Sequence, residues 1–83
     1  MVQGQDNAIL SAALCRAARG LLDWTQTDLA RNAEVSRSTV RDFEGERHDI
    51  HRATAAQLRR AFEAHSVAFV MIDGMGPGVC LRR

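Results

Sequence analysis

The chain has 83 residues, of which 46% are hydrophobic and 25% are charged, and its formal net charge is +1. This length supports one domain with a single small core, and the composition is that of a globular chain rather than a disordered or fibrous one. No apolar run approaches the roughly 20 residues of a membrane-spanning helix, and the first residues lack the pattern of a signal peptide, so we expect a cytoplasmic protein without membrane contact.

Residues 1–6 show little pattern and are predicted to form a flexible tail. From Asn7, apolar residues recur at steps of three and four, which predicts an amphipathic helix that ends near Asp23. The apolar residues of this helix are Ile9, Leu10, Ala13, Leu14, Ala17 and Leu21. Cys15 would be a small apolar residue of the same helix. Because Cys15 and Cys80 lie far apart without metal-ligand spacing, both are expected to be reduced thiols.

The segment from Gln26 to Gly45 has the pattern of two short helices joined by a tight turn. Its apolar residues occur where the helices would meet: Leu29, Ala30, Val35, Val40 and Phe43. The small side chain of Ala30 allows two helices to cross closely. Thr25, with Asp28 three residues later, would cap the first helix, and Ser36 would cap the second. The segment is therefore predicted to be a helix-turn-helix.

A polar loop follows, from the helix-stopping Gly45 to Arg52. His48 and His51 lie in this loop, and a metal site with His65 as a third ligand is one reading of them. The spacing falls on a loop, and no carboxylate or thiolate cluster accompanies it. We therefore predict no metal and no other cofactor.

Thr54 and Gln57 have the spacing of a capping box, which would open a fourth helix ending near His65 or Ser66. Its buried side would include Leu58, Ala61 and Phe62. Residues 67–83 then read as a β-hairpin with a Gly-rich turn. Because two strands alone are hardly stable in water, this hairpin either packs on the helices or pairs edge to edge with a second copy in a symmetric dimer.

The run TQTDLARNAEVSRSTVRDFEGE resembles the helix-turn-helix of the Cro/C1-type repressors, the xenobiotic-response-element family of bacterial and phage regulators. The similarity extends from about Arg16 to about Phe62. It implies a mainly α fold: a four-helix, lambda-repressor-like DNA-binding domain over residues 7–66, here with a short C-terminal β-hairpin. The family usually has Gly in the turn where this chain has Glu34, so the turn either adjusts or bears roughly 1 kcal/mol of strain.

The resemblance implies a sequence-specific transcriptional regulator of the bacterial cytoplasm and nucleoid, most simply a repressor, that binds a palindromic operator as a homodimer. Residues 36–44 would be the recognition helix in the major groove. Arg37 would contact guanine bidentately, with Ser38 a short donor or acceptor, while Arg41 would read a base or neutralise a phosphate. Gln26 would bind a phosphate at a helix N-terminus. The other candidate DNA-binding residues are Ser36, Thr39, Asp42, Arg47 and Arg52.

The same resemblance implies that Arg19 pairs with Glu44 and so holds the first helix against the recognition helix; the alternative is two unrelated surface charges. A different functional class is also open, because a helix-turn-helix can serve as a protein-binding module such as an antitoxin or anti-activator. The exposed positions Arg37, Ser38 and Arg41 favour DNA, since a protein interface more often presents aliphatic or aromatic anchors. No catalytic arrangement is recognisable, so the chain is not expected to be an enzyme.

Overall fold

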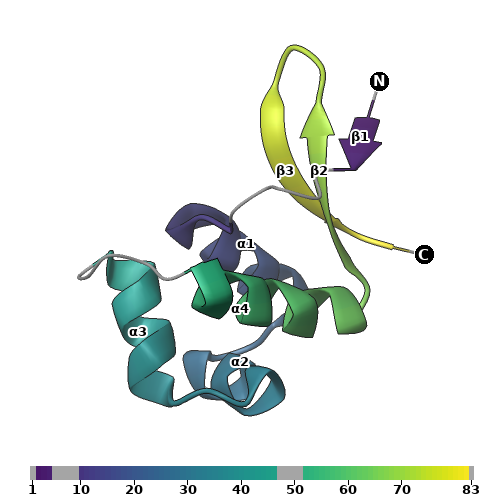
Figure 1. Ribbon diagram of the computed structural model, residues 1–83. Helices are drawn as coiled ribbons and strands as arrows, with labels where there is room; N and C mark the ends of the chain where they lie inside the picture. Colours follow the sequence, from purple (N-terminus) through teal and green to yellow (C-terminus); the bar gives the residue numbers. More distant parts are fainter. Residues whose placement is uncertain (1, 5–9, 47–51, 83) are drawn as a thin grey trace.

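The structure is a computed structural model, and it describes residues 2–4, 10–46 and 52–82 (Figure 1). Its elements, in chain order, are β1 (Val2–Gly4), α1 (Ala12–Leu22), α2 (Gln26–Ala33), α3 (Arg37–Gly45), α4 (Arg52–Ala64), β2 (Val67–Ile72) and β3 (Gly76–Leu81). The predicted fold class, mainly α with four helices and a C-terminal β-hairpin, is confirmed. In the described ranges, every helix is too short or too polar to cross a bilayer.

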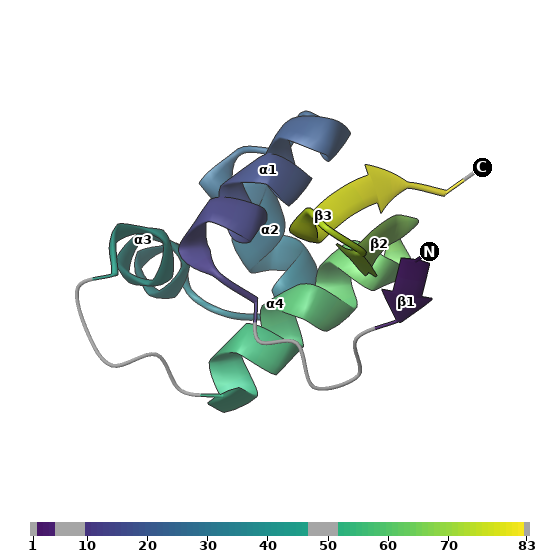
Figure 2. The ribbon, with the colours of Figure 1, turned by 90° about the horizontal axis from the view of Figure 1, so that it is seen from above.

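The helices and the base of the hairpin share one hydrophobic core. Its largest fully buried side chains are Phe62, Leu29, Leu58, Val40, Val67 and Cys15. The two views show the hairpin projecting past the helices on the side opposite α3 (Figures 1 and 2). The core therefore anchors one side of α3 on the other helices and leaves its opposite side uncovered.

Helix α1 begins later than the periodicity predicted, and its buried face is only partly the predicted one, since Leu14 packs half-buried against the core as expected. Ser11 caps it, its hydroxyl accepting a hydrogen bond from the Leu14 amide at 3.0 Å, so the helix does not start near Asn7. The buried residues are Ala12, Cys15 and Ala18, whereas Ala13, Ala17 and Leu21 are exposed. Alanines occur on both sides of this helix, and tertiary packing selected the side with the smallest residues because it permits close helix approach.

The turn between α2 and α3 keeps the shape that glycine usually provides. Glu34 ends α2 in the left-handed conformation, with φ +59°. The amide of Val35 donates to the Ala30 carbonyl at 3.0 Å and the amide of Glu34 to the Arg31 carbonyl at 3.3 Å, which is the Schellman pattern. Of the two alternatives for this turn, the structure shows the strained residue and not an adjusted turn.

Replacing Glu34 by glycine should therefore raise the free energy of unfolding by about 1 kcal/mol, because glycine has no Cβ penalty at positive φ. Urea denaturation measures the change. Glu34→Ala is the matched control, since it removes the same side chain but retains the penalty. An equal gain in both variants would assign the effect to the lost charge and not to the backbone.

Helix α4 begins at Arg52, two residues before the predicted cap, so Thr54 lies inside its first turn and the predicted capping box is wrong. Gln57 has a longer-range role: its Nε2 donates to the Ala33 carbonyl at 2.8 Å. The last carbonyls of a helix have no partner within that helix, and Gln57 supplies one for α2. The end of α4 at Ala64 agrees with the prediction.

The three strands form an antiparallel sheet in the order β1-β2-β3. The hairpin pairs Val67 with Leu81 and Ile72 with Gly76. At its turn the Met75 amide donates to the Ile72 carbonyl at 2.9 Å, and Gly74 takes φ +80°. Val67 and Phe69 are buried against the helices. Of the two roles left open for the hairpin, packing on its own domain is thus observed.

Residues 2–4, which were predicted to belong to a flexible tail, instead form β1 along the second edge of β2. The backbone groups on that edge would otherwise lack strand partners. A segment of three residues carries too short a pattern to be recognised as a strand. Its pairing depends on the edge that β2 offers.

Candidate nucleic-acid interface

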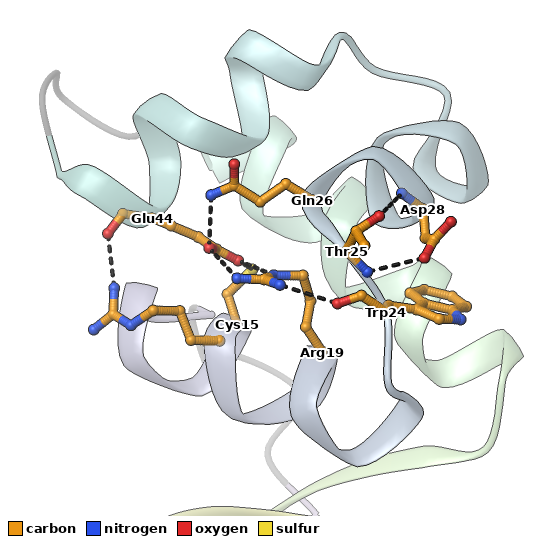
Figure 3. A network of polar contacts seen from close by, with 8 residues as sticks. Cys15, Arg19, Trp24, Thr25, Gln26, Asp28 and Glu44 are labelled. Atoms are coloured by element: carbon orange, nitrogen blue, oxygen red, sulfur yellow. Dashed lines mark hydrogen bonds and ion pairs between the residues drawn. The ribbon is translucent and has the colours of Figure 1, made fainter.

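Both helices of the helix-turn-helix begin at the predicted caps. The Thr25 hydroxyl accepts from the Asp28 amide at 3.0 Å, and the Asp28 carboxylate accepts from the Thr25 amide at 2.9 Å (Figure 3). These hydrogen bonds lower the pKa of Asp28. Ser36 caps α3, its hydroxyl accepting from the Thr39 amide at 3.1 Å. Local sequence therefore determines where each helix starts.

Helix α3 buries one side and exposes the other. Val40, Phe43 and Glu44 are buried. The small buried residues Ala30 and Ala33 of α2 lie in the same core cluster. Both views place α3 at the periphery of the molecule (Figures 1 and 2). Its outward side carries the exposed residues Arg37, Ser38 and Arg41, as predicted.

The side chains on the outward side of α3 differ in the partners that they have within the protein. Among the described residues, no side chain pairs with the exposed guanidinium of Arg37. The Ser38 hydroxyl lies 3.0 Å from that of Ser36. Arg41 Nε lies 3.7 Å from the carboxylate of Asp42, which balances part of its charge. Arg37 is therefore the outward cation whose hydrogen-bond donors are most open to a partner.

Ser36 and Thr39 have local partners. Their hydroxyl oxygens are 2.7 Å apart, and Thr39 is half-buried. This geometry explains both side chains as part of the N-terminal cap of α3. Contacts from these two residues to DNA stay predictions.

Glu44 is the polar centre of this region (Figure 3). The predicted pair is confirmed: Arg19 Nε and Nη2 donate to the two carboxylate oxygens of Glu44, each at 2.7 Å. The Glu44 side chain is only 4% exposed. Arg19 also donates to the Trp24 carbonyl at 3.0 Å, beyond the end of α1. The bidentate pair thus joins α1, its C-terminal turn and α3.

Three further donors converge on the same residue. Gln26 Nε2 donates to Glu44 Oε1 at 3.1 Å, and the Cys15 thiol donates to Oε2 at 3.1 Å. Arg16 Nη1 donates to the Glu44 backbone carbonyl at 2.8 Å. None of these three bonds was predicted from the sequence. The Arg19–Glu44 pair implied by the resemblance was the available signal for the bonds from Gln26 and Cys15, because a carboxylate has more acceptor sites than one arginine fills.

The network determines the charge state of its members. Burial by itself would raise the pKa of Glu44, but the hydrogen bonds from Arg19, Gln26 and Cys15 and the charge of Arg19 outweigh it and lower this pKa. The pKa of Cys15 is raised, first by burial and then by its bond to the Glu44 carboxylate. At neutral pH, Glu44 is therefore an anion and Cys15 a thiol.

The remaining predicted site residues are placed as follows. Gln26 turns its amide toward Glu44, so its side chain is not presented freely for a phosphate, and that contact stays a prediction. Arg52 is exposed on the first turn of α4, not on the loop where it was expected. Arg47, His48 and His51 lie outside the described residues.

The third histidine of the considered metal site, His65, packs edge-on against Trp24, with ring centroids 4.8 Å apart. In the described ranges, no group of three or more His, Cys, Asp and Glu side chains could hold a metal ion.

Comparison of the chain with protein-family models gave no match, and comparison with curated proteins gave none either.

Proposed function

We propose that the chain is a sequence-specific DNA-binding transcriptional regulator, acting as a repressor, that inserts α3 into the major groove of a palindromic operator. The proposal rests on one observation: α3 has one side buried in the core and one exposed side that carries polar and charged residues. Val40, Phe43 and Glu44 hold one side in the core, while Arg37 and Ser38 stand exposed on the first turn of the other. In helix-turn-helix proteins the N-terminal residues of the second helix meet the base edges.

Arg37 supplies the main base contact. Its guanidinium is a planar fork that matches the O6 and N7 acceptors of guanine, and no described side chain competes for it. Ser38 offers a second, adaptable contact beside it. Arg41 lies one turn further along and adds positive charge to the same outward side, reduced by the nearby Asp42.

The other parts of the region orient α3 and hold the phosphates. The Arg19–Glu44 pair holds the C-terminal end of α3 on α1, so this bidentate contact orients α3 relative to the other helices. The N-terminus of α2 presents backbone N–H groups and a positive partial charge, which suit a phosphate oxygen. The resemblance of residues 16–62 to the Cro/C1-type repressors supports the same arrangement.

Substitution of Arg37 by alanine tests the base contact. On a duplex selected from a random pool by the purified protein, the variant should lose on the order of 1–3 kcal/mol of binding free energy, and much less on random duplex. Fluorescence anisotropy titrations at fixed salt give both values. Arg60→Ala is the control, because it removes the same charge from an exposed position on α4. Equal losses on both duplexes would mean that Arg37 contacts the phosphate backbone of the DNA and not a base.

A salt titration separates this function from that of a protein-binding module, which the net charge of only +1 also suits. A DNA-binding protein releases counterions, so its affinity falls steeply as salt rises. An absence of binding to any selected duplex at low salt would contradict the regulator and favour an antitoxin-like or anti-activator role.

A further inference from the structure

The outward side of α3 carries two arginines one helical turn apart. Arg37 and Arg41 are both exposed, and residues four apart in a helix lie on the same face. Their Cα atoms are separated by about 6 Å along the helix axis, since each residue adds about 1.5 Å. Successive nucleotides of one DNA strand are about 3.4 Å apart along the duplex axis. The spacing of the two guanidinium groups therefore suits bases one or two base-pair steps apart.

The other residues of α3 do not suit an adenine or a thymine. Adenine is read bidentately by the amide of Asn or Gln, and the sequence of α3, RSTVRDFEG, contains neither. The methyl group of thymine is read by an apolar contact, but Val40 and Phe43 are buried. Thr39 is half-buried, with its hydroxyl 2.7 Å from that of Ser36. The bidentate readers that α3 exposes are thus its two arginines, which match guanine.

Arg41 differs from Arg37 in having a carboxylate beside its guanidinium. Its Nε lies 3.7 Å from Asp42 Oδ1, so the carboxylate approaches the Nε side of the planar group. In the described ranges, neither Nη group of Arg41 has a hydrogen-bond partner. The two Nη groups form the fork that the O6 and N7 acceptors of one guanine would fill.

The charge balance favours a base over a phosphate as the partner of Arg41. A phosphate attracts an arginine through its net charge, and the Asp42 carboxylate cancels part of that charge and repels the phosphate. A guanine edge is uncharged, so it requires oriented donors more than net charge. The side chains of Arg41 and Asp42 are 56% and 33% exposed, and a pair this exposed contributes little to stability. The contact therefore suits the orientation of Arg41 better than the stabilisation of the fold.

We infer that α3 reads a half-site with two guanines one or two base-pair steps apart, one bound by Arg37 and the other by Arg41, and that Asp42 is a positioning residue for Arg41. The inference rests on the proposed insertion of α3 into the major groove. It adds the base content of the half-site, and it assigns Arg41 to a base and not to a phosphate.

Base analogues test whether the guanines are read from the major groove. In the duplex selected from a random pool, each guanine of the pair is replaced in turn by 7-deazaguanine, which lacks the N7 acceptor. Each replacement should weaken binding by at least about fivefold, the loss of one hydrogen bond to a charged donor. Inosine is the matched control, because it keeps O6 and N7 and lacks only the amino group in the minor groove, so it should bind as guanine does. Equal losses with the two analogues would overturn the inference.

Alanine substitutions assign each guanine to one arginine. For the unmodified chain, changing either guanine to adenine should weaken binding roughly 5- to 150-fold. Arg37→Ala should lose this preference at one position and Arg41→Ala at the other. Arg60→Ala, which removes a charge from an exposed position on α4, should retain both preferences. If Arg41→Ala retains both preferences, Arg41 contacts a phosphate and the inference is wrong.

Substitution of Asp42 by alanine tests its positioning role. The guanine preference at the Arg41 position should fall about threefold, while that at the Arg37 position should not change. Binding to random duplex should become tighter, because a negative charge is lost. A purely electrostatic role would leave both preferences unchanged, and a contact from Asp42 to cytosine would remove a preference at a third position. Either result would overturn the role of Asp42.

The selection from the random pool separates this inference from the proposed function. The selected half-site should contain the two guanines at the stated spacing. A selected half-site without them would overturn the inference and would leave a regulator that reads other features of DNA. The absence of any bound duplex at low salt would instead contradict the regulator itself.

Discussion

Replacing Glu44 by glutamine should lower the free energy of unfolding by about 3 kcal/mol, since removing one charge of a buried pair leaves the other without compensation. Arg19 would lose its anionic partner, and Gln26 and Cys15 would point donors at a site that holds an amide group. Urea denaturation at neutral pH measures the loss. Glu34→Gln, at an exposed position, removes the same charge and should change stability by less than about 0.5 kcal/mol.

The same substitution should alter the response to acid. The pKa of Glu44 is lower in the folded chain than in the unfolded one, where it is about 4.3. Its ionised form therefore stabilises the fold above that value, and this stabilisation is lost as pH falls through the folded-state pKa. The unmodified chain should lose stability progressively below about pH 4.3, and Glu44→Gln should lose less. An identical acid dependence in both proteins would show that ionisation of Glu44 does not contribute to the free energy of unfolding.

Replacing Phe69 by alanine should cost about 3 kcal/mol or more, because the large side chain connects the hairpin to the helical core. Phe69 is only 7% exposed, and its ring centroid lies 6.1 Å from that of Phe62. The Arg59 guanidinium lies 5.1 Å from the ring centroid of Phe69. Trp24 stacks on Phe62 at 5.8 Å, so its fluorescence should report the loosened packing during a urea titration.

Val70→Ala is the control for this prediction, since Val70 is half-buried and lies on the opposite face of β2. Its loss should be about 1 kcal/mol, in line with the smaller apolar area removed. If both substitutions cost the same small amount, the hairpin would be held mainly by a partner molecule and not by its own helices.

Residues that act within one turn of the chain could be interpreted correctly without the fold. Thr25 and Ser36 cap the helices that follow them, and Arg37, Ser38 and Arg41 are exposed as the periodicity required. Capping bonds join atoms three residues apart, so their geometry depends little on the rest of the molecule. The Arg19–Glu44 pair is different: it was expected only from a family resemblance, because the pair is 25 residues apart in sequence.

What the sequence determined by itself was the order of helices and hairpin, the caps of α2 and α3, and the outward face of α3. Tertiary structure alone decided the buried face of α1, the pairing of residues 2–4 with β2, and the convergence of Cys15, Arg16 and Gln26 on Glu44. Periodicity reports the preferences of neighbouring residues, whereas these features depend on how closely α1 and α3 approach and on which strand edge is left open. The apolar periodicity favoured the face with Ala13, Ala17 and Leu21, but alanines on both sides of α1 made this preference weak, so packing made the choice.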